Sequence, residues 1–131
     1  MPRHWIVKTE PSTYSWSDLE RDGKAVWDGV HNPVAIRNLS EMKPGDDVLI
    51  YHTGSEKAVV GLAKLTKAAY PDPKEKDPKL LVVELAPVRR LAAPVTLAEI
   101  KADSLFKDSP LVRQGRLSVV PLTEEQFKRF R

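Results

Sequence analysis

Residues 5–11 read Trp-Ile-Val-Lys-Thr-Glu-Pro, and they set the pattern that the rest of the chain follows. The apolar start of this stretch predicts a strand over residues 5–8. Ser15 with Asp18 three residues later is typical of a capping box, so a short helix is expected to begin there and to end at Gly23. The chain therefore begins with a short strand and a short capped helix.

The same alternation is expected to continue to the C-terminus. Further strands are predicted over residues 25–27, 47–52, 58–69, 80–88 and 116–120, and further helices over residues 33–42, 97–106 and 124–130. Gly61, inside one of these strands, predicts a bulge or a close approach of the backbone to another group. Residues 71–78 contain three prolines and predict a solvated loop.

Successive strands are expected to pair as hairpins, not through crossover helices between parallel strands. We therefore predict an α+β fold in which short helices surround a small, mostly antiparallel β-barrel. The chain has 131 residues, of which 41% are hydrophobic, and this is enough for one domain with its own core. The domain is expected to span residues 1–131.

Composition also limits the classes of protein. No apolar run reaches the roughly 20 residues that a bilayer requires, so no membrane partner is expected. The N-terminal residues lack the apolar core of an export signal, and we expect a cytoplasmic location. The sequence contains no cysteine, which excludes disulfides, thiol catalysis and thiolate metal sites.

Charge and aromatic residues are distributed unevenly. Residues 66–131 contain the larger share of lysine and arginine, whereas all three tryptophans and all three histidines lie in residues 1–65. Phosphate contacts supply affinity for nucleic acid, and aromatic faces stack on bases. The distribution suits a nucleic-acid ligand, although a net charge of +3 is also ordinary for a small protein.

Common catalytic motifs are missing from the sequence. It contains no glycine-rich phosphate loop, no Gly-x-Ser-x-Gly elbow and no His-Glu-x-x-His. No metal site, cofactor or catalytic residue is predicted. One enzymatic alternative stays open, in which Lys8, Glu10 and His52 act on a small molecule or nucleotide; a protein-interaction domain is another.

The segment around Trp27 is more suggestive of recognition. The indole is followed at once by Asp28-Gly29 and by Asn32, so that an aromatic face and several hydrogen-bonding groups converge. Such a face stacks on a flat base, and polar groups then read the edge of the base. The alternative is that Trp27 belongs to the core, as is expected for Trp5 and Trp16.

A series of motifs runs through the whole chain in order. They lie at residues 5–11, 14–19, 27–32, 45–46, 51–53, 60–61, 94–97, 110–113 and 116–119. Together these motifs closely resemble the EVE domain. The resemblance implies a PUA-like fold, related to that of the YTH readers of methylated adenine and of thymocyte nuclear protein. It also implies non-catalytic binding of a modified nucleobase, often a modified cytosine, in DNA or RNA.

The resemblance further implies roles for individual residues. Trp27 would be the stacking wall of an aromatic-walled pocket, and Asn32 would read the edge of the base. The entrance or floor would be lined by Lys8, Tyr14 and Ser15. The neighbouring strand would close the pocket with Tyr51, His52 and Thr53. Arg116 and Ser118 would contact the nucleic-acid backbone.

The chain also departs from the family pattern. His31 stands where the family usually has arginine, residues 34–37 read Val-Ala-Ile-Arg, and the loop at 71–78 is short and is followed by Lys-Leu-Leu at 79–81. These departures leave open whether one wall of the pocket is missing. Because extracting a base from a duplex costs a few kcal/mol, we expect a single-stranded or flipped base as ligand, or delivery of the base by a partner protein.

Overall fold

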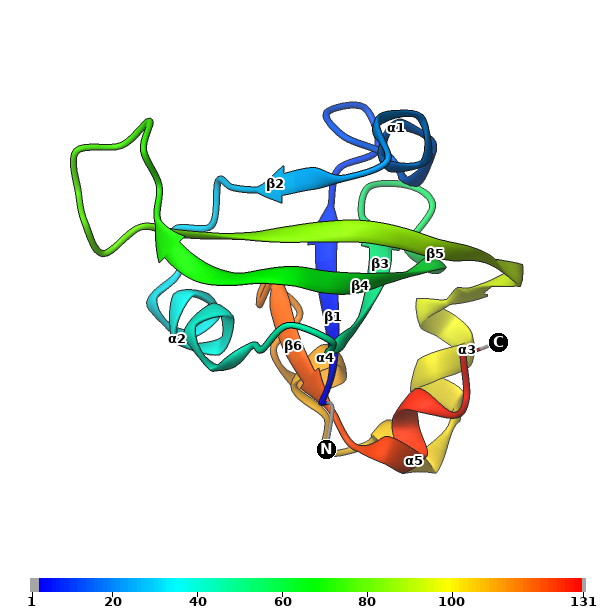
Figure 1. Ribbon diagram of the computed structural model, residues 1–131. Coiled ribbons are helices and arrows are strands. Elements are labelled where there is room, and N and C mark those ends of the chain that lie inside the picture. Colours follow the sequence, from blue (N-terminus) through cyan, green and yellow to red (C-terminus); the bar gives the residue numbers. More distant parts are fainter. Residues whose placement is uncertain (1–2, 131) are drawn as a thin grey trace.

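Figure 1 presents the computed structural model, which describes residues 3–130. In chain order the elements are β1 (His4–Thr9), α1 (Trp16–Asp22), β2 (Ala25–Trp27), α2 (Pro33–Glu41), β3 (Asp47–His52), β4 (Ala58–Pro71), β5 (Leu81–Thr96), α3 (Leu97–Ala102), the 3-10 helix η1 (Ser104–Phe106), α4 (Pro110–Arg113), β6 (Val119–Leu122) and α5 (Glu124–Phe127). The predicted mixture of strands and short helices is confirmed.

The six strands form one sheet in the order β2-β5-β4-β3-β1-β6. All neighbouring pairs are antiparallel except β1 and β3, which run parallel. The long strands β4 and β5 cross in front of β1 and β3 in Figure 1, so the sheet is strongly twisted. Within residues 3–130, β2 and β6 remain as two edges, and the predicted closure into a barrel is not confirmed.

Several boundaries differ from the prediction for local reasons. The last strand begins at Val119 and not at residue 116, since residues 115–116 form a turn after α4, a helix that was not predicted. The helix predicted over 97–106 is divided at Asp103, whose side chain accepts a hydrogen bond from the Leu105 N–H at 3.0 Å and starts η1. β5 continues to Thr96, eight residues beyond its predicted end.

A buried tryptophan packs α1 against the sheet. The side chains of Trp5 and Trp16 have 0% exposure, as predicted for core residues. Gly61 lies directly against the second indole, because a Cβ built on it would stand 2.5 Å from the Trp16 ring. The register of β4 also shifts beside Gly61, so both the close approach and the bulge are confirmed.

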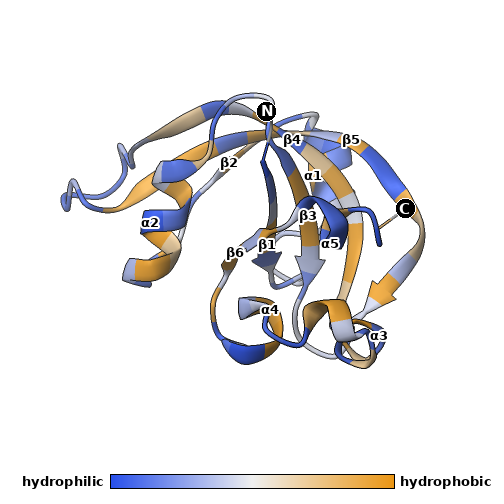
Figure 2. Cartoon of the chain, turned by 90° about the horizontal axis from the view of Figure 1, so that it is seen from below, coloured by the Kyte–Doolittle hydropathy of each residue, from blue (hydrophilic) through white to orange (hydrophobic). Residues whose placement is uncertain are grey.

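Apolar and polar residues are separated as expected for a folded domain. Figure 2 shows apolar segments along the sheet strands and hydrophilic residues on the loop between β4 and β5. No helix within residues 3–130 combines the length and the hydropathy needed to span a bilayer. The same residues contain no cluster of three or more histidine or carboxylate side chains arranged to hold a metal ion.

Candidate functional site

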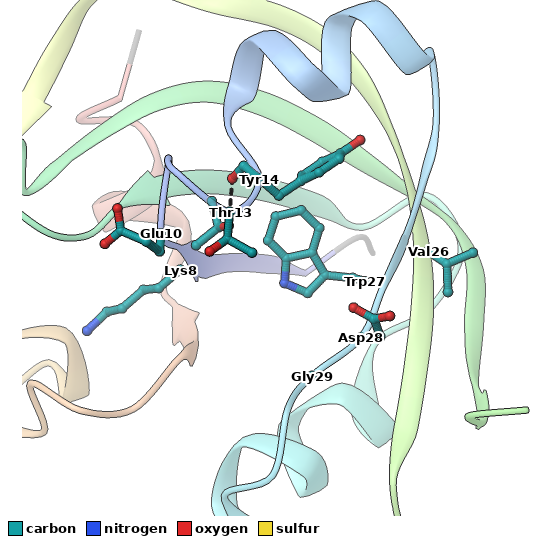
Figure 3. A pocket seen from close by; sticks show the side chains of 9 residues that line it. Lys8, Glu10, Thr13, Tyr14, Val26, Trp27, Asp28 and Gly29 are labelled. Carbon is teal, nitrogen blue, oxygen red and sulfur yellow. Dashed lines mark hydrogen bonds between the residues drawn. The ribbon is translucent and has the colours of Figure 1, made fainter. Parts of the chain in front are cut away.

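A pocket of about 420 Å³ opens where the ends of β1 and β2 come close to each other. Its volume falls within the range of about 300–1,000 Å³ that is usual for small-molecule sites. It is lined by Lys8, Thr9, Glu10, Thr13, Tyr14, Val26, Trp27, Asp28 and Gly29 (Figure 3). We call it the Trp27 pocket.

Trp27 forms the aromatic wall of this pocket. It is the last residue of β2, where it pairs with Val83 of β5, and only 7% of the residue is exposed. Tyr14 meets the indole edge to face, with ring centroids 6.1 Å apart and an interplanar angle of 86°. Figure 3 shows the indole nitrogen on the side that faces the open space between Lys8 and Gly29. Packing therefore holds the ring, while its N–H is directed toward the cavity.

The second aromatic residue is held in place by a carboxylate. The Tyr14 hydroxyl points away from the pocket and donates a hydrogen bond to Asp22 at 2.9 Å. Burial, followed by this hydrogen bond and the negative charge of Asp22, raises the pKa of Tyr14 to about 12. Tyr14 therefore presents its ring, not its hydroxyl, toward the pocket.

Lys8 supplies the cation of the pocket. Its ammonium group donates to the Gly115 carbonyl at 2.9 Å and lies 5.4 Å from the centroid of the Tyr51 ring. Burial lowers the pKa of Lys8 below its ordinary value of 10.5. The bond to Gly115 also connects β1 to the turn that precedes β6.

Two carboxylates line the same cavity. Glu10 accepts hydrogen bonds from the Ser12 hydroxyl at 3.1 Å and from the Thr53 hydroxyl at 3.3 Å. Asp28 is exposed and directly precedes Gly29, which has a φ of 76°. Residues with a side chain rarely adopt this left-handed conformation, so glycine permits the turn that leads from β2 toward α2.

Three residues predicted for the site have their polar atoms engaged in structure outside the pocket lining. Ser15 caps α1, and the Asn32 side-chain oxygen caps α2 by accepting from two backbone N–H groups. His52 Nε2 accepts a hydrogen bond from the backbone N–H of Trp16 at 3.0 Å. Its Nδ1 therefore carries the proton, which it donates to the Glu56 carboxylate at 2.7 Å.

The other predicted residues surround the pocket without lining it. Tyr51 lies behind Lys8, and Thr53 contacts Glu10. Arg116 is exposed in the turn beside Gly115, and the Ser118 carbonyl accepts the Lys8 backbone N–H at 2.9 Å.

Lining residues that sequence reasoning did not assign to the base site are Thr9, Glu10, Thr13, Val26, Asp28 and Gly29. Their positions next to predicted residues were the available signal.

The segments that depart from the family pattern lie elsewhere. They line a separate groove between α2 and the β4–β5 loop, formed by His31, Pro33, Ile36, Arg37, Ser40, Asp77, Pro78, Lys79, Leu80 and Leu81. We call it the α2 groove.

Comparison with known proteins identifies relatives over nearly the whole chain. The sequence profile of the EVE domain matches residues 3–131. Human thymocyte nuclear protein 1 is 32% identical over 158 aligned residues, covering 95% of this chain and 70% of that protein.

Solved structures agree with this match. A protein from Agrobacterium tumefaciens superimposes with a TM-score of 0.93 at 34% identity, covering 97% of this chain and 89% of that one. A crystal structure of human THYN1 in complex with DNA containing 5-methylcytosine superimposes with a TM-score of 0.88 at 30% identity, covering 97% and 94% of the two chains.

Proposed function

Because the chain belongs to the EVE domain family, we propose that it is a non-catalytic module that recognises a modified cytosine in DNA and takes the base into the Trp27 pocket. The observation that carries this proposal is the structure of human THYN1 in complex with DNA containing 5-methylcytosine. The relevant part of the chain is the pocket whose aromatic wall is Trp27.

Stacking on Trp27 supports affinity for a flat ring. The indole is held by Tyr14 and by its place in β2, so little conformational entropy is lost when a base packs against it. Stacking on an aromatic side chain contributes about 1–3 kcal/mol per base. This term does not distinguish one base from another, and specificity requires polar groups.

The polar lining favours cytosine over thymine. Cytosine presents an amino donor at N4, whereas thymine presents an acceptor at O4. A carboxylate of Glu10 or Asp28 that faces this position of the base accepts from the amino group of cytosine and repels the oxygen of thymine. Lys8 and the Trp27 N–H are donors for the remaining acceptor atoms of the cytosine edge.

A single-stranded or flipped base is the form that fits a concave pocket. Extrusion from a duplex costs a few kcal/mol, which is close to the stacking gain at Trp27. An unpaired strand avoids this cost, and we propose it as the preferred ligand. RNA is the second candidate, and a contact to its 2′-hydroxyl would distinguish it from DNA.

The enzymatic alternative has less support in the geometry. Lys8 and Glu10 line the pocket, but His52 does not. Both ring nitrogens of His52 are bound to Trp16 and Glu56, so the imidazole is not positioned to exchange a proton with a ligand beside Trp27.

Tryptophan fluorescence tests the proposal. Single strands that differ only in cytosine, 5-methylcytosine or thymine are titrated into the protein. We expect saturable quenching by the 5-methylcytosine strand. The ratio of the affinities for the 5-methylcytosine and thymine strands should fall in Glu10→Gln and in Asp28→Asn. It should not fall in the control Glu124→Gln, because Glu124 is an exposed carboxylate outside the pocket. Equal affinity for the cytosine and 5-methylcytosine strands would overturn recognition of the modification, and equal affinity for all three strands would overturn recognition of cytosine as well.

A further inference from the structure

The α2 groove has a volume of about 590 Å³ and is separate from the Trp27 pocket. Figures 1 and 2 both place the loop between β4 and β5 on the same side of the molecule as α2. One wall of the groove comes from α2 and the residue before its N-cap. The other wall comes from residues 77–81.

The groove combines an apolar floor with a cationic rim. Ile36, Leu80 and Leu81 are partly buried and offer apolar surface. Arg37 and Lys79 are exposed on opposite walls. An apolar surface between two cations suits a nucleotide, whose base packs on the floor while its phosphates meet the positive charges.

Five other arginines among residues 3–130 are already paired with carboxylates, whereas the two cations of the groove are not. Ion pairs to carboxylates are formed by Arg3, Arg21, Arg90, Arg113 and Arg129. Arg37 and Lys79 have no carboxylate oxygen within 4.0 Å among residues 3–130. They are therefore available to an anionic ligand without the cost of breaking an existing pair.

One acidic residue also lies at the groove. Asp77 accepts the Lys79 backbone N–H at 2.9 Å, so its carboxylate is engaged in the turn of the loop. When this carboxylate is counted with Arg37 and Lys79, the charged lining of the groove remains positive overall. Charge complementarity thus favours an anionic partner.

The groove and the Trp27 pocket are neighbours along the chain. Gly29 lines the pocket and His31 lines the groove. Two residues span at most about 7 Å. The backbones of the two linings therefore come within about 7 Å of each other at Gly29 and His31.

We propose that the α2 groove is a second subsite, which holds the nucleotide next to the recognised base. Its phosphates lie between Arg37 and Lys79, and its base packs on Ile36 and Leu80. This inference rests on the proposed function of the Trp27 pocket. It assigns a role to the segments at 31–37 and 79–81, which depart from the family pattern.

A comparison of two ligands separates the subsites. The nucleoside 5-methyl-2′-deoxycytidine fills only the Trp27 pocket, whereas a single-stranded trinucleotide with central 5-methylcytosine reaches both. We expect the trinucleotide to bind the unmodified protein about tenfold tighter. The double variant Arg37→Ala/Lys79→Ala should lose most of this gain and keep its affinity for the nucleoside. For binding of the trinucleotide to this variant, the slope of log K against log salt concentration should become shallower by about 0.7 for each phosphate that the variant no longer neutralises.

The matched control is Arg89→Ala/Lys128→Ala, which removes two exposed cations outside both sites. This variant should retain the gain of the trinucleotide. The subsite proposal is overturned if the gain survives in Arg37→Ala/Lys79→Ala, or if the unmodified protein binds both ligands equally, while the Trp27 pocket stands in either case. Failure of both ligands to bind would instead overturn the proposed function.

Discussion

Replacing Trp27 separates its role in binding from its role in packing. If a base stacks on the indole, Trp27→Ala removes about 1–3 kcal/mol of binding free energy. This corresponds to a loss of affinity of about 5- to 150-fold. Trp27→Phe keeps an aromatic face but removes the N–H that points into the pocket, so we expect a smaller loss.

The same replacement also affects stability. Only 7% of Trp27 is exposed, and truncation of a buried aromatic residue to alanine costs about 3–5 kcal/mol. A domain of this size has a total stability of about 5–15 kcal/mol. Trp27→Ala is therefore expected to remain folded with a much lower melting temperature, and Trp27→Phe to remain close to the unmodified protein.

The assay combines thermal unfolding with titration of a 5-methylcytosine strand. Trp5 and Trp16 have 0% exposure, so ligand-dependent quenching reports on Trp27 and should disappear in Trp27→Phe. Binding to both variants is measured below their melting temperatures by a label on the DNA. A folded Trp27→Ala protein that binds the strand as tightly as the unmodified protein would refute stacking on this residue.

Three further predictions concern the frame of the site. Gly61→Ala should destabilise the fold by about 3 kcal/mol in chemical denaturation, because its Cβ would stand 2.5 Å from a buried indole, whereas Gly115→Ala, with nothing within 4 Å of its Cβ, should change little. Burial alone would raise the pKa of Asp46, but three hydrogen bonds to its carboxylate lower the pKa overall. The ionised Asp46 therefore stabilises the fold at pH values above its ordinary pKa. This contribution is lost as the pH falls through the lowered pKa. Asp46→Asn should therefore show lower stability at neutral pH and a weaker acid dependence of its unfolding free energy. The pKa of Tyr14 is raised to about 12, so the neutral Tyr14 contributes fully to stability below its ordinary pKa, and this contribution is lost as the pH rises through 12. Asp22→Asn should lower the pKa of Tyr14 in an ultraviolet titration, because the variant removes the charged acceptor of the Tyr14 hydroxyl. An unchanged titration curve would exclude the hydrogen bond to Asp22 as a cause of the raised pKa.

Local structure could be predicted where one side chain determines the backbone near it. The Ser15–Asp18 box caps α1 as the sequence indicated, and Thr96 with Glu99 caps α3 at the start of the helix predicted over residues 97–106. The parallel pairing of β1 with β3 could not be predicted, because its residues lie about 40 positions apart and carry no local signal for strand direction. Tertiary packing, not propensity, decides that pairing.

Predicting the site had the same limit. The position of Trp27 directly before the Asp28-Gly29 turn made it a candidate from the sequence, and in the structure it lines a pocket. Asn32 precedes a proline, and this pattern suits a helix cap as well as contact with a ligand. The side-chain oxygen accepts from Val34 and Ala35 N–H groups, so it acts as a cap. Whether Asn32 also reads a base through its amide N–H groups stays a prediction.

Under the proposed function, the charged groups in the Trp27 pocket discriminate between bases, and cations outside the pocket supply affinity for the strand. The Trp27 pocket contains one ammonium group and two carboxylates, so it attracts no phosphate strongly and its polar groups are suited to discriminate between bases. Five arginines form ion pairs with carboxylates, so each attracts phosphate less than an unpaired cation does. Under this proposal, affinity for a strand comes from exposed cations such as Arg116, next to Gly115, and Arg37 and Lys79 in the α2 groove. With so few phosphate contacts, we expect a shallow dependence of binding on salt and weak binding to unmodified nucleic acid. A module of this kind responds mainly to the chemistry of the base.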